Sequence, residues 1–150
     1  KSVTFAKTEY AEIPARFEAG TPSIADGIAL GIALEYVMGV GLSSIAAHEH
    51  ELLLYGSGKL GEIPGLRIIG TAHEKAGVIS FVLDGIHATD AAMILDQFGI
   101  AVRTGHHCAQ PVMDRFKVAA TARASFAMYN TREEIDALAE GLQKVRRMFA

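Results

Sequence analysis

The sequence predicts an α+β domain in which helices pack against a mainly antiparallel sheet. Apolar residues recur at helical spacing across residues 24–38, and residues 131–147 carry apolar residues on one face of a helix. Between them, residues 66–69 and 78–83 are short, rich in β-branched residues and bounded by glycine, which is typical of strands. At 150 residues, half of them hydrophobic, the chain is long enough to bury one core and too short for two domains of ordinary size.

The N-terminal residues 1–22 show no clear periodicity and contain two of the four prolines of the chain. We expect this segment to be a linking arm of extended or looped backbone, followed by one domain over residues 23–150. The domain begins with a helix over residues 24–38, which Ser23 can cap. Because most of its residues are apolar, we expect this helix to be mostly buried.

Turn and capping signals place the remaining elements. A second helix begins at Ser43 or Ser44 and ends before Pro64. The strands at 66–69 and 78–83 are expected to pair as a hairpin. The later elements are a helix capped by Thr89 or Asp90 and ending at Gly99, a strand over 100–104, a short helix over 111–116, a strand over 122–128, and a final helix that begins at Asn130 or Thr131 with Glu133 and Glu134 in its first turn.

Composition and charge exclude several classes of function. The formal net charge is −3 and the basic residues are scattered, so we expect no nucleic-acid partner. No apolar run reaches the roughly 20 residues of a membrane span, which predicts a soluble chain without a membrane partner. The single cysteine favours a reducing compartment, and we expect the cytoplasm. The chain begins at Lys1 without methionine or a signal-peptide pattern, so we expect a fragment or a processed product.

The single cysteine, Cys108, is the strongest candidate for chemistry. It lies in the run Arg103-Thr104-Gly105-His106-His107-Cys108-Ala109-Gln110-Pro111, where two imidazoles and an arginine are placed to favour the thiolate. Free cysteines are often inert and buried, but the polar neighbours of Cys108 predict a loop. Together with His106 and His107 it could bind a metal ion. Three adjacent residues do not easily face one ion, however, and no second ligand cluster follows, so we expect no metal. Cys108 is therefore a candidate nucleophile.

Two further positions each have a functional and a plain interpretation. Arg123 lies in an otherwise apolar strand and must face either solvent at a sheet edge or an anion such as a substrate carboxylate. Thr21 precedes a helix N-terminus and could bind a phosphate, although Gly-Thr-Pro is also an ordinary helix entry. The residues alone leave both alternatives open. Four other histidines are expected to be solvated or to cap helices: His48, His50, His73 and His87.

Three runs of the sequence together resemble a known family. They are Arg16-Phe17-Glu18-Ala19-Gly20-Thr21-Pro22, Arg103-Thr104-Gly105-His106-His107-Cys108-Ala109, and Arg123-Ala124-Ser125-Phe126-Ala127-Met128-Tyr129-Asn130-Thr131. Over nearly its whole length the chain resembles the C-terminal part of group II, SufS-type cysteine desulfurases. These are pyridoxal-phosphate enzymes of the class V aminotransferase family. The resemblance implies the small C-terminal domain of a fold-type I pyridoxal-phosphate enzyme.

The resemblance also implies a reaction. L-Cysteine is converted to L-alanine, and its sulfur is kept as an enzyme persulfide for iron–sulfur cluster assembly. Cys108 matches the nucleophile that accepts sulfur, and Arg123 matches the arginine that binds the substrate carboxylate. Thr21, with Gly20 beside it, matches the position that contacts the cofactor phosphate of the other subunit in the family's homodimer. Arg103 and His107 lie in the matching loop, where the resemblance implies supporting roles in binding substrate and stabilising the thiolate.

One part of the family pattern is missing from this sequence. The Schiff-base lysine and the histidine that stacks on the cofactor ring both lie upstream of the Gly20-Thr21 motif in the family, and neither is present here. The resemblance therefore implies that a large domain carries most of the cofactor pocket and that this chain alone is inactive. Two rival functions stay open: selenocysteine lyase activity, and a non-catalytic module in which Cys108 carries sulfur to or from a SufE- or SufU-like partner.

Overall fold

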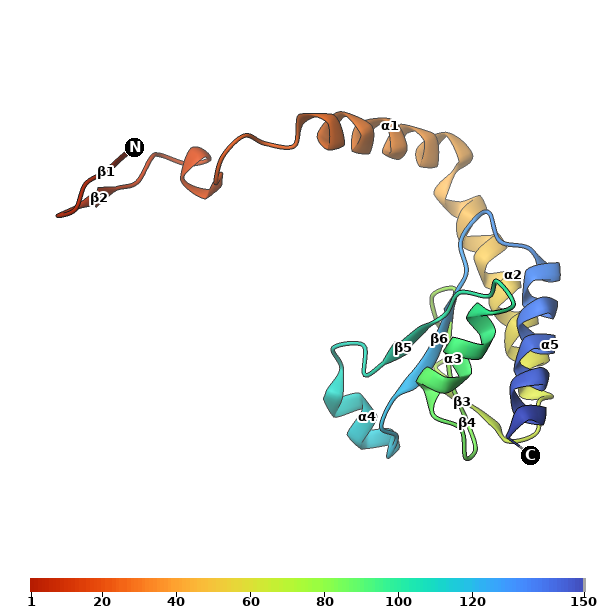
Figure 1. The fold of residues 1–150 in the computed structure, drawn as a ribbon. Helices are drawn as coiled ribbons and strands as arrows, with labels where there is room; N and C mark the ends of the chain where they lie inside the picture. Colours follow the sequence, from red (N-terminus) through yellow and green to blue (C-terminus); the bar gives the residue numbers. More distant parts are fainter. Residues whose placement is uncertain (150) are drawn as a thin grey trace. The chain divides into compact units, whose positions relative to one another are not determined.

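The computed structural model describes residues 1–149, whose secondary structure is coloured in chain order in Figure 1. It separates into two compact units, residues 1–42 and residues 43 onward. The segment predicted as an arm, residues 1–22, therefore belongs to the same unit as the helix that follows it.

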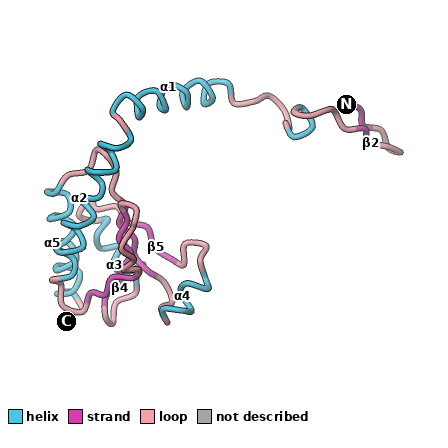
Figure 2. The backbone as a smooth tube through the Cα atoms, turned by 180° about the vertical axis from the view of Figure 1, so that it is seen from behind, coloured by secondary structure: helices cyan, strands magenta, loops and turns pink. Residues whose placement is uncertain are grey.

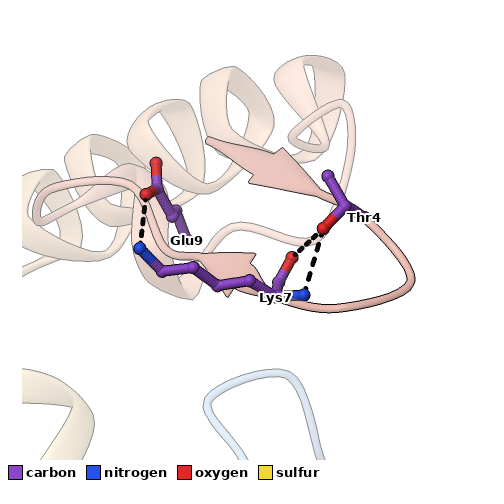
Figure 3. A network of polar contacts seen from close by, with 3 residues as sticks. All are labelled: Thr4, Lys7 and Glu9. Atoms are coloured by element: carbon purple, nitrogen blue, oxygen red, sulfur yellow. Dashed lines mark hydrogen bonds and ion pairs between the residues drawn. The ribbon is translucent and has the colours of Figure 1, made fainter.

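The N-terminal unit begins with a small β-hairpin. β1 (Ser2–Val3) pairs antiparallel with β2 (Thr8–Glu9). The Thr4 hydroxyl closes the turn, because it accepts from the Lys7 amide and donates to the Lys7 carbonyl, both at 3.0 Å (Figure 3). Lys7 Nζ also lies 2.8 Å from Glu9 Oε1. Such an exposed ion pair contributes at most about 1 kcal/mol.

The N-terminal unit continues through a 3-10 turn, η1 (Ala15–Phe17), into helix α1 (Ile24–Val40). The predicted helix is confirmed, but the prediction that it is mostly buried is wrong, because none of its residues is buried. Its apolar side chains lie around the whole helix, and nothing in its unit covers them. The large exposed apolar side chains of α1 are Ile24, Ile28, Leu30, Ile32, Leu34, Tyr36, Met38 and Val40.

No single helix among residues 1–149 is both long enough and apolar enough to cross a membrane. Only α1 and the following helix α2 (Leu42–Gly61), taken together across the break between them, reach that length and composition.

The C-terminal unit is built on a four-stranded sheet in which every neighbouring pair is antiparallel. The first two strands form the predicted hairpin, and the last strand in the sequence lies inside the sheet with a neighbour on each side. The α+β fold class with a mainly antiparallel sheet is therefore confirmed. In spatial order the strands are β3 (Leu66–Ile69), β4 (Val78–Leu83), β6 (Thr121–Ser125) and β5 (Arg103–Gly105).

Helices α2, α3 (Ala88–Asp96) and α5 (Arg132–Met148) pack together with the sheet around one core. Figure 1 shows α2 and α5 side by side with α3 next to them, and the reverse view in Figure 2 shows the same grouping. Helix α4 (Gln110–Phe116) lies away from this group, beyond β5, in both views. The sheet therefore has one face that α2, α3 and α5 do not cover.

The core lies between the covered face of the sheet and these three helices. Along β4, buried residues alternate with half-buried ones, so that Ile79 and Phe81 point toward the helices. They meet Leu60 of α2, Leu95 of α3 and Leu142 of α5, each of which is fully buried. Full burial of a side chain of this kind stabilises the folded state by about 1.5–3 kcal/mol.

The structure confirms one predicted helix cap and corrects two other predicted boundaries. Helix α5 is capped by Thr131, one of the two predicted caps, and Thr131 and Glu134 bond each other's backbone amides in a capping box. Helix α3 is capped by His87, whose Nδ1 accepts from the Thr89 amide at 3.3 Å, so the predicted cap at Thr89 or Asp90 is wrong. The predicted strand from residue 100 is also shorter, because Ile100 packs on the core as part of a loop.

Gly141 lies where α5 approaches α3, and alanine at this position should destabilise the C-terminal unit. An added Cβ would lie 2.8 Å from both Ile100 Cδ1 and Leu95 Cδ2. Leu95 is fully buried, so neighbouring groups must move at a cost of about 1–3 kcal/mol, which exceeds the helix-propensity gain of about 1 kcal/mol. We expect urea titration of Gly141→Ala to show a free energy of unfolding lower by about 1 kcal/mol.

Gly58→Ala is the matched control for this prediction. Gly58 is exposed in helix α2 and no heavy atom lies within 4 Å of its Cβ position. The change should therefore raise the free energy of unfolding by roughly 0.5–1 kcal/mol. Stabilisation by both variants would contradict the close approach at Gly141.

Candidate functional site

A cavity of about 200 Å³ lies on the face of the sheet that α2, α3 and α5 leave uncovered. Its polar lining comes from Ser80 of β4, His107 of the loop after β5, and Thr121 and Arg123 of β6. Helix α4 forms an apolar wall. A larger cavity of about 360 Å³, between residues 98–102 and the start of α5, contains none of the predicted site residues.

Arg123 lines this cavity from strand β6. Its strand, β6, is bonded to β4 on one side and β5 on the other, so the alternative of a solvated arginine on an edge strand is wrong. The Nε of Arg123 is buried and has no hydrogen-bond partner among residues 1–149. A buried cationic donor without a partner is costly. The position therefore fits an anion supplied from outside the described residues.

Arg103 faces Arg123 directly across the β5–β6 pair. Like charges placed opposite each other on one face of a sheet repel. An anion bound between or beside them would relieve this repulsion, and a carboxylate matches the planar fork of a guanidinium. The pair thus supports the expectation that Arg123, assisted by Arg103, binds a carboxylate.

Cys108 is exposed and lies at the tip of a tight turn. The Ala109 amide donates to the His106 carbonyl at 2.9 Å, which closes a four-residue turn with His107 and Cys108 in the middle. Both central residues have positive φ, +52° and +56°, the combination of a type I′ turn. Residues other than glycine, asparagine and aspartate rarely adopt this conformation, and each costs of order 1 kcal/mol. The turn presents the thiol to solvent, as expected for a nucleophile or a sulfur carrier.

His107 links the loop after β5 to strand β6. Its Nε2 lies 3.1 Å from Thr121 Oγ1. Burial lowers the pKa of His107 below its ordinary value of 6.5, and repulsion from Arg123 lowers it further. His107 is therefore held neutral near pH 7, so it can position the loop but adds no positive charge beside Cys108.

The lowered pKa of His107 should make the folded chain less stable in acid. Below about pH 6.5 the unfolded chain binds a proton at this position more readily than the folded chain. The stability is therefore complete above pH 6.5 and is lost as the pH falls toward the lowered pKa. His107→Asn removes this proton-binding site. We expect its stability deficit in urea titration to be smaller at about pH 5.5 than at about pH 7.5, and an equal deficit at both would contradict the assignment.

Two residues of this region were missed by the sequence-based reasoning. Thr121 and Ser80 line the cavity but carry no motif. The spacing of Thr121 and Arg123, two residues apart on one strand, could have predicted that they lie on the same face of the sheet, since alternate residues share a face. His48 was expected to be solvated, but it is half-buried, with Nε2 3.0 Å from the carbonyl oxygen of Asn130, a residue distant in sequence.

The described residues do not by themselves form a pyridoxal-phosphate pocket. Thr21 and Gly20 are exposed in the N-terminal unit, where Gly20 has a φ of +114°. Among residues 1–149, no lysine lines the cavity of Arg123. Lys59 pairs with Asp136 at 3.1 Å, and Lys75 donates to the Gly70 carbonyl at 2.9 Å.

Comparison with known proteins places this chain in a family. Residues 1–138 match the family Aminotransferase class-V. A cysteine desulfurase of Synechococcus elongatus is 55% identical over 144 residues, which cover 96% of this chain and 23% of that protein. The crystal structure of the cysteine desulfurase CsdA (S-sulfonic acid) from Escherichia coli has a TM-score of 0.84 at 31% identity, covering 99% of this chain and 37% of that chain.

A third relative gives the same result. The apo structure of a cysteine desulfurase from Thermococcus onnurineus has a TM-score of 0.82 at 37% identity and covers 97% of this chain and 36% of that chain. The chain thus spans between 23% and 37% of these relatives. Pyridoxal phosphate is the cofactor that the family implies. From the match over residues 1–138, this chain belongs to the aminotransferase class-V family, and its relatives include cysteine desulfurases.

Proposed function

We propose that this chain supplies the nucleophile and the carboxylate clamp of a group II, SufS-type cysteine desulfurase. The observation that carries the proposal is the buried, unpartnered Nε of Arg123, which needs an anion, on the cavity whose rim continues into the Cys108 turn. The carboxylate of a substrate amino acid would supply this missing hydrogen-bond partner. The relatives named cysteine desulfurase share about half of this sequence.

The proposed chemistry transfers one sulfur atom. The Cys108 thiolate forms an S–S bond with the sulfur of substrate L-cysteine while the substrate Cβ–S bond breaks. The electron pair of that bond stays with Cβ, which takes up a proton to become the methyl group of L-alanine. The sulfur is oxidised and the carbon is reduced, so L-cysteine and one thiol give L-alanine and one persulfide without an external oxidant or reductant.

The other site residues have binding and positioning roles in this proposal. Arg123 binds the substrate carboxylate, and Arg103 adds positive charge opposite it. His107, held neutral, orients the loop rather than stabilising the thiolate by charge. Thr21 and Gly20 contact the cofactor phosphate of a second subunit in a homodimer.

Several parts of the proposed enzyme lie outside this chain. A large domain carries the cofactor lysine, and the exposed apolar side chains of α1 are a surface for such a partner to cover. Without that domain the chain is inactive. The persulfide passes to a SufE- or SufU-like acceptor for iron–sulfur cluster assembly. We propose a cytoplasmic setting, because an exposed thiol nucleophile requires reducing conditions.

The test is a sulfur balance in the complete, cofactor-loaded enzyme that contains this chain. With L-cysteine as substrate, we expect one alanine for each persulfide formed, and a mass increase of one sulfur atom on the peptide that contains Cys108. The same measurement with selenocysteine as substrate distinguishes a selenocysteine lyase, which would release alanine faster from selenocysteine than from cysteine. Failure to form alanine from either substrate would refute the proposed function.

A second function is favoured by the exposure of Cys108 at the turn tip, which also suits a thiol that only carries sulfur between proteins. In that case a persulfide forms on Cys108 when a persulfide donor is supplied, but Cys108 is not needed for alanine formation. The effect of replacing Cys108 separates these two functions.

A further inference from the structure

We propose that Thr121 is a positioning residue, which holds the Cys108 thiol in register with Arg123 through its contact with His107. The consequence for catalysis rests on the proposed function, whereas the consequence for the conformation of the loop does not. Thr121 lies outside the motifs of the sequence. It is buried, it contacts His107, and His107 belongs to a turn with positive φ.

Because Thr121 is buried, its hydroxyl depends on its one hydrogen-bond partner. Thr121 is 0% exposed and is the only buried polar or charged residue among residues 1–149. A buried hydroxyl without a hydrogen bond costs about 1–3 kcal/mol. Its partner is His107 Nε2 at 3.1 Å. The contact joins residues 14 positions apart in sequence, so it links the loop to the sheet.

The loop needs such a link because its backbone is unfavourable. His107 and Cys108 are consecutive residues at positive φ, which persists only where surrounding contacts fix it. Within the loop, the Ala109 amide bonds the His106 carbonyl and the Cys108 amide bonds His106 Nδ1 at 3.1 Å. These contacts are local and move with the loop. The contact between His107 and Thr121 ties the turn to β6.

The same strand carries the carboxylate-binding arginine. Thr121 and Arg123 are two residues apart on β6 and line one cavity, so their side chains share a face. One rigid strand thus holds the clamp directly and the nucleophile through His107. A displacement of about 1 Å between reacting groups can reduce a rate by about a hundredfold. Loss of the hydroxyl should therefore affect the chemical step and leave carboxylate binding intact.

The experiment compares Thr121→Val, which keeps the shape but removes the hydroxyl, with Thr121→Ser, which keeps the hydroxyl. Thr89→Val makes the same chemical change at an exposed position of α3 and is the matched control. Amide hydrogen exchange at Cys108 and Ala109 is measured in the 150-residue chain. Separately, kcat and KM for L-cysteine are measured in the complete, cofactor-loaded enzyme.

For Thr121→Val we expect exchange at both amides to become faster by about tenfold, since the turn opens more often. We expect kcat to fall by between about tenfold and about a hundredfold with KM unchanged. Thr121→Ser should restore both, and Thr89→Val should change neither. If Thr121→Val does not fold, His107→Phe removes the same contact from the loop side and should show the same exchange and the same loss of kcat.

Three results would overturn the proposal. One is unchanged exchange and kcat in folded Thr121→Val. Another is a folded Thr121→Ser that behaves like Thr121→Val, because the hydroxyl would then not be responsible. The third is an increase in KM with kcat unchanged, which would place the effect at Arg123. If the unmodified enzyme forms no alanine, the proposed function fails, while the exchange measurements still decide whether Thr121 holds the turn.

Discussion

Replacing Cys108 with serine should abolish persulfide formation and reduce alanine formation from L-cysteine by at least about a thousandfold. A serine hydroxyl is almost entirely protonated near neutral pH, and an S–O bond to the substrate sulfur cannot replace the persulfide. The side chain is exposed and almost unchanged in size, so the fold should be unaffected. Alanine release and the mass of the peptide containing residue 108 are the measurements, made in the complete cofactor-loaded enzyme.

The stability of Cys108→Ser is the control for this prediction. Its free energy of unfolding should remain within about 0.5 kcal/mol of the unmodified protein, as for most surface substitutions. A variant that makes alanine at the normal rate but no longer passes sulfur to an acceptor would contradict the catalytic role. It would favour the function in which Cys108 only carries sulfur.

Replacing Arg123 with methionine should lower kcat/KM for L-cysteine by between about a hundredfold and about a thousandfold, mainly through a higher KM. The variant loses a charged, two-pronged hydrogen-bond donor for the substrate carboxylate. Its folded state should be no less stable, because the change removes a partly buried cation whose Nε has no partner among residues 1–149. Steady-state kinetics with cysteine and urea titration of the same preparations test both parts.

Arg67→Met is the matched control for the arginine prediction. Arg67 is exposed on β3 and does not line the cavity, so the same loss of charge should leave kcat/KM unchanged. A large loss of stability in Arg123→Met would show that Arg123 has a structural partner. An unchanged KM would show that the carboxylate binds elsewhere.

Features that depend on neighbours in sequence could be predicted with good accuracy. The hairpin of β3 and β4 has the predicted bounds, since glycine-bounded β-branched segments specify it locally. The capping box of Thr131 and Glu134 also follows from residues within one turn. Cys108 is exposed, as its polar neighbours in sequence indicate. Helix α1 shows the limit, because its apolar composition predicts a need for burial but not whether the chain itself meets that need.

The candidate site depends on contacts that no local pattern specifies. The sequence alone determined which residue types are available for chemistry: one thiol, the histidines beside it and an arginine in a strand. Only the tertiary structure decided that β6 is an inner strand, that Arg103 lies opposite Arg123, and that Thr121 holds His107. Strand order and these side-chain contacts are settled by the packing of segments far apart in the chain. These contacts depend on the packing of the whole domain and not on neighbouring residues, so they leave no periodic signal in the sequence.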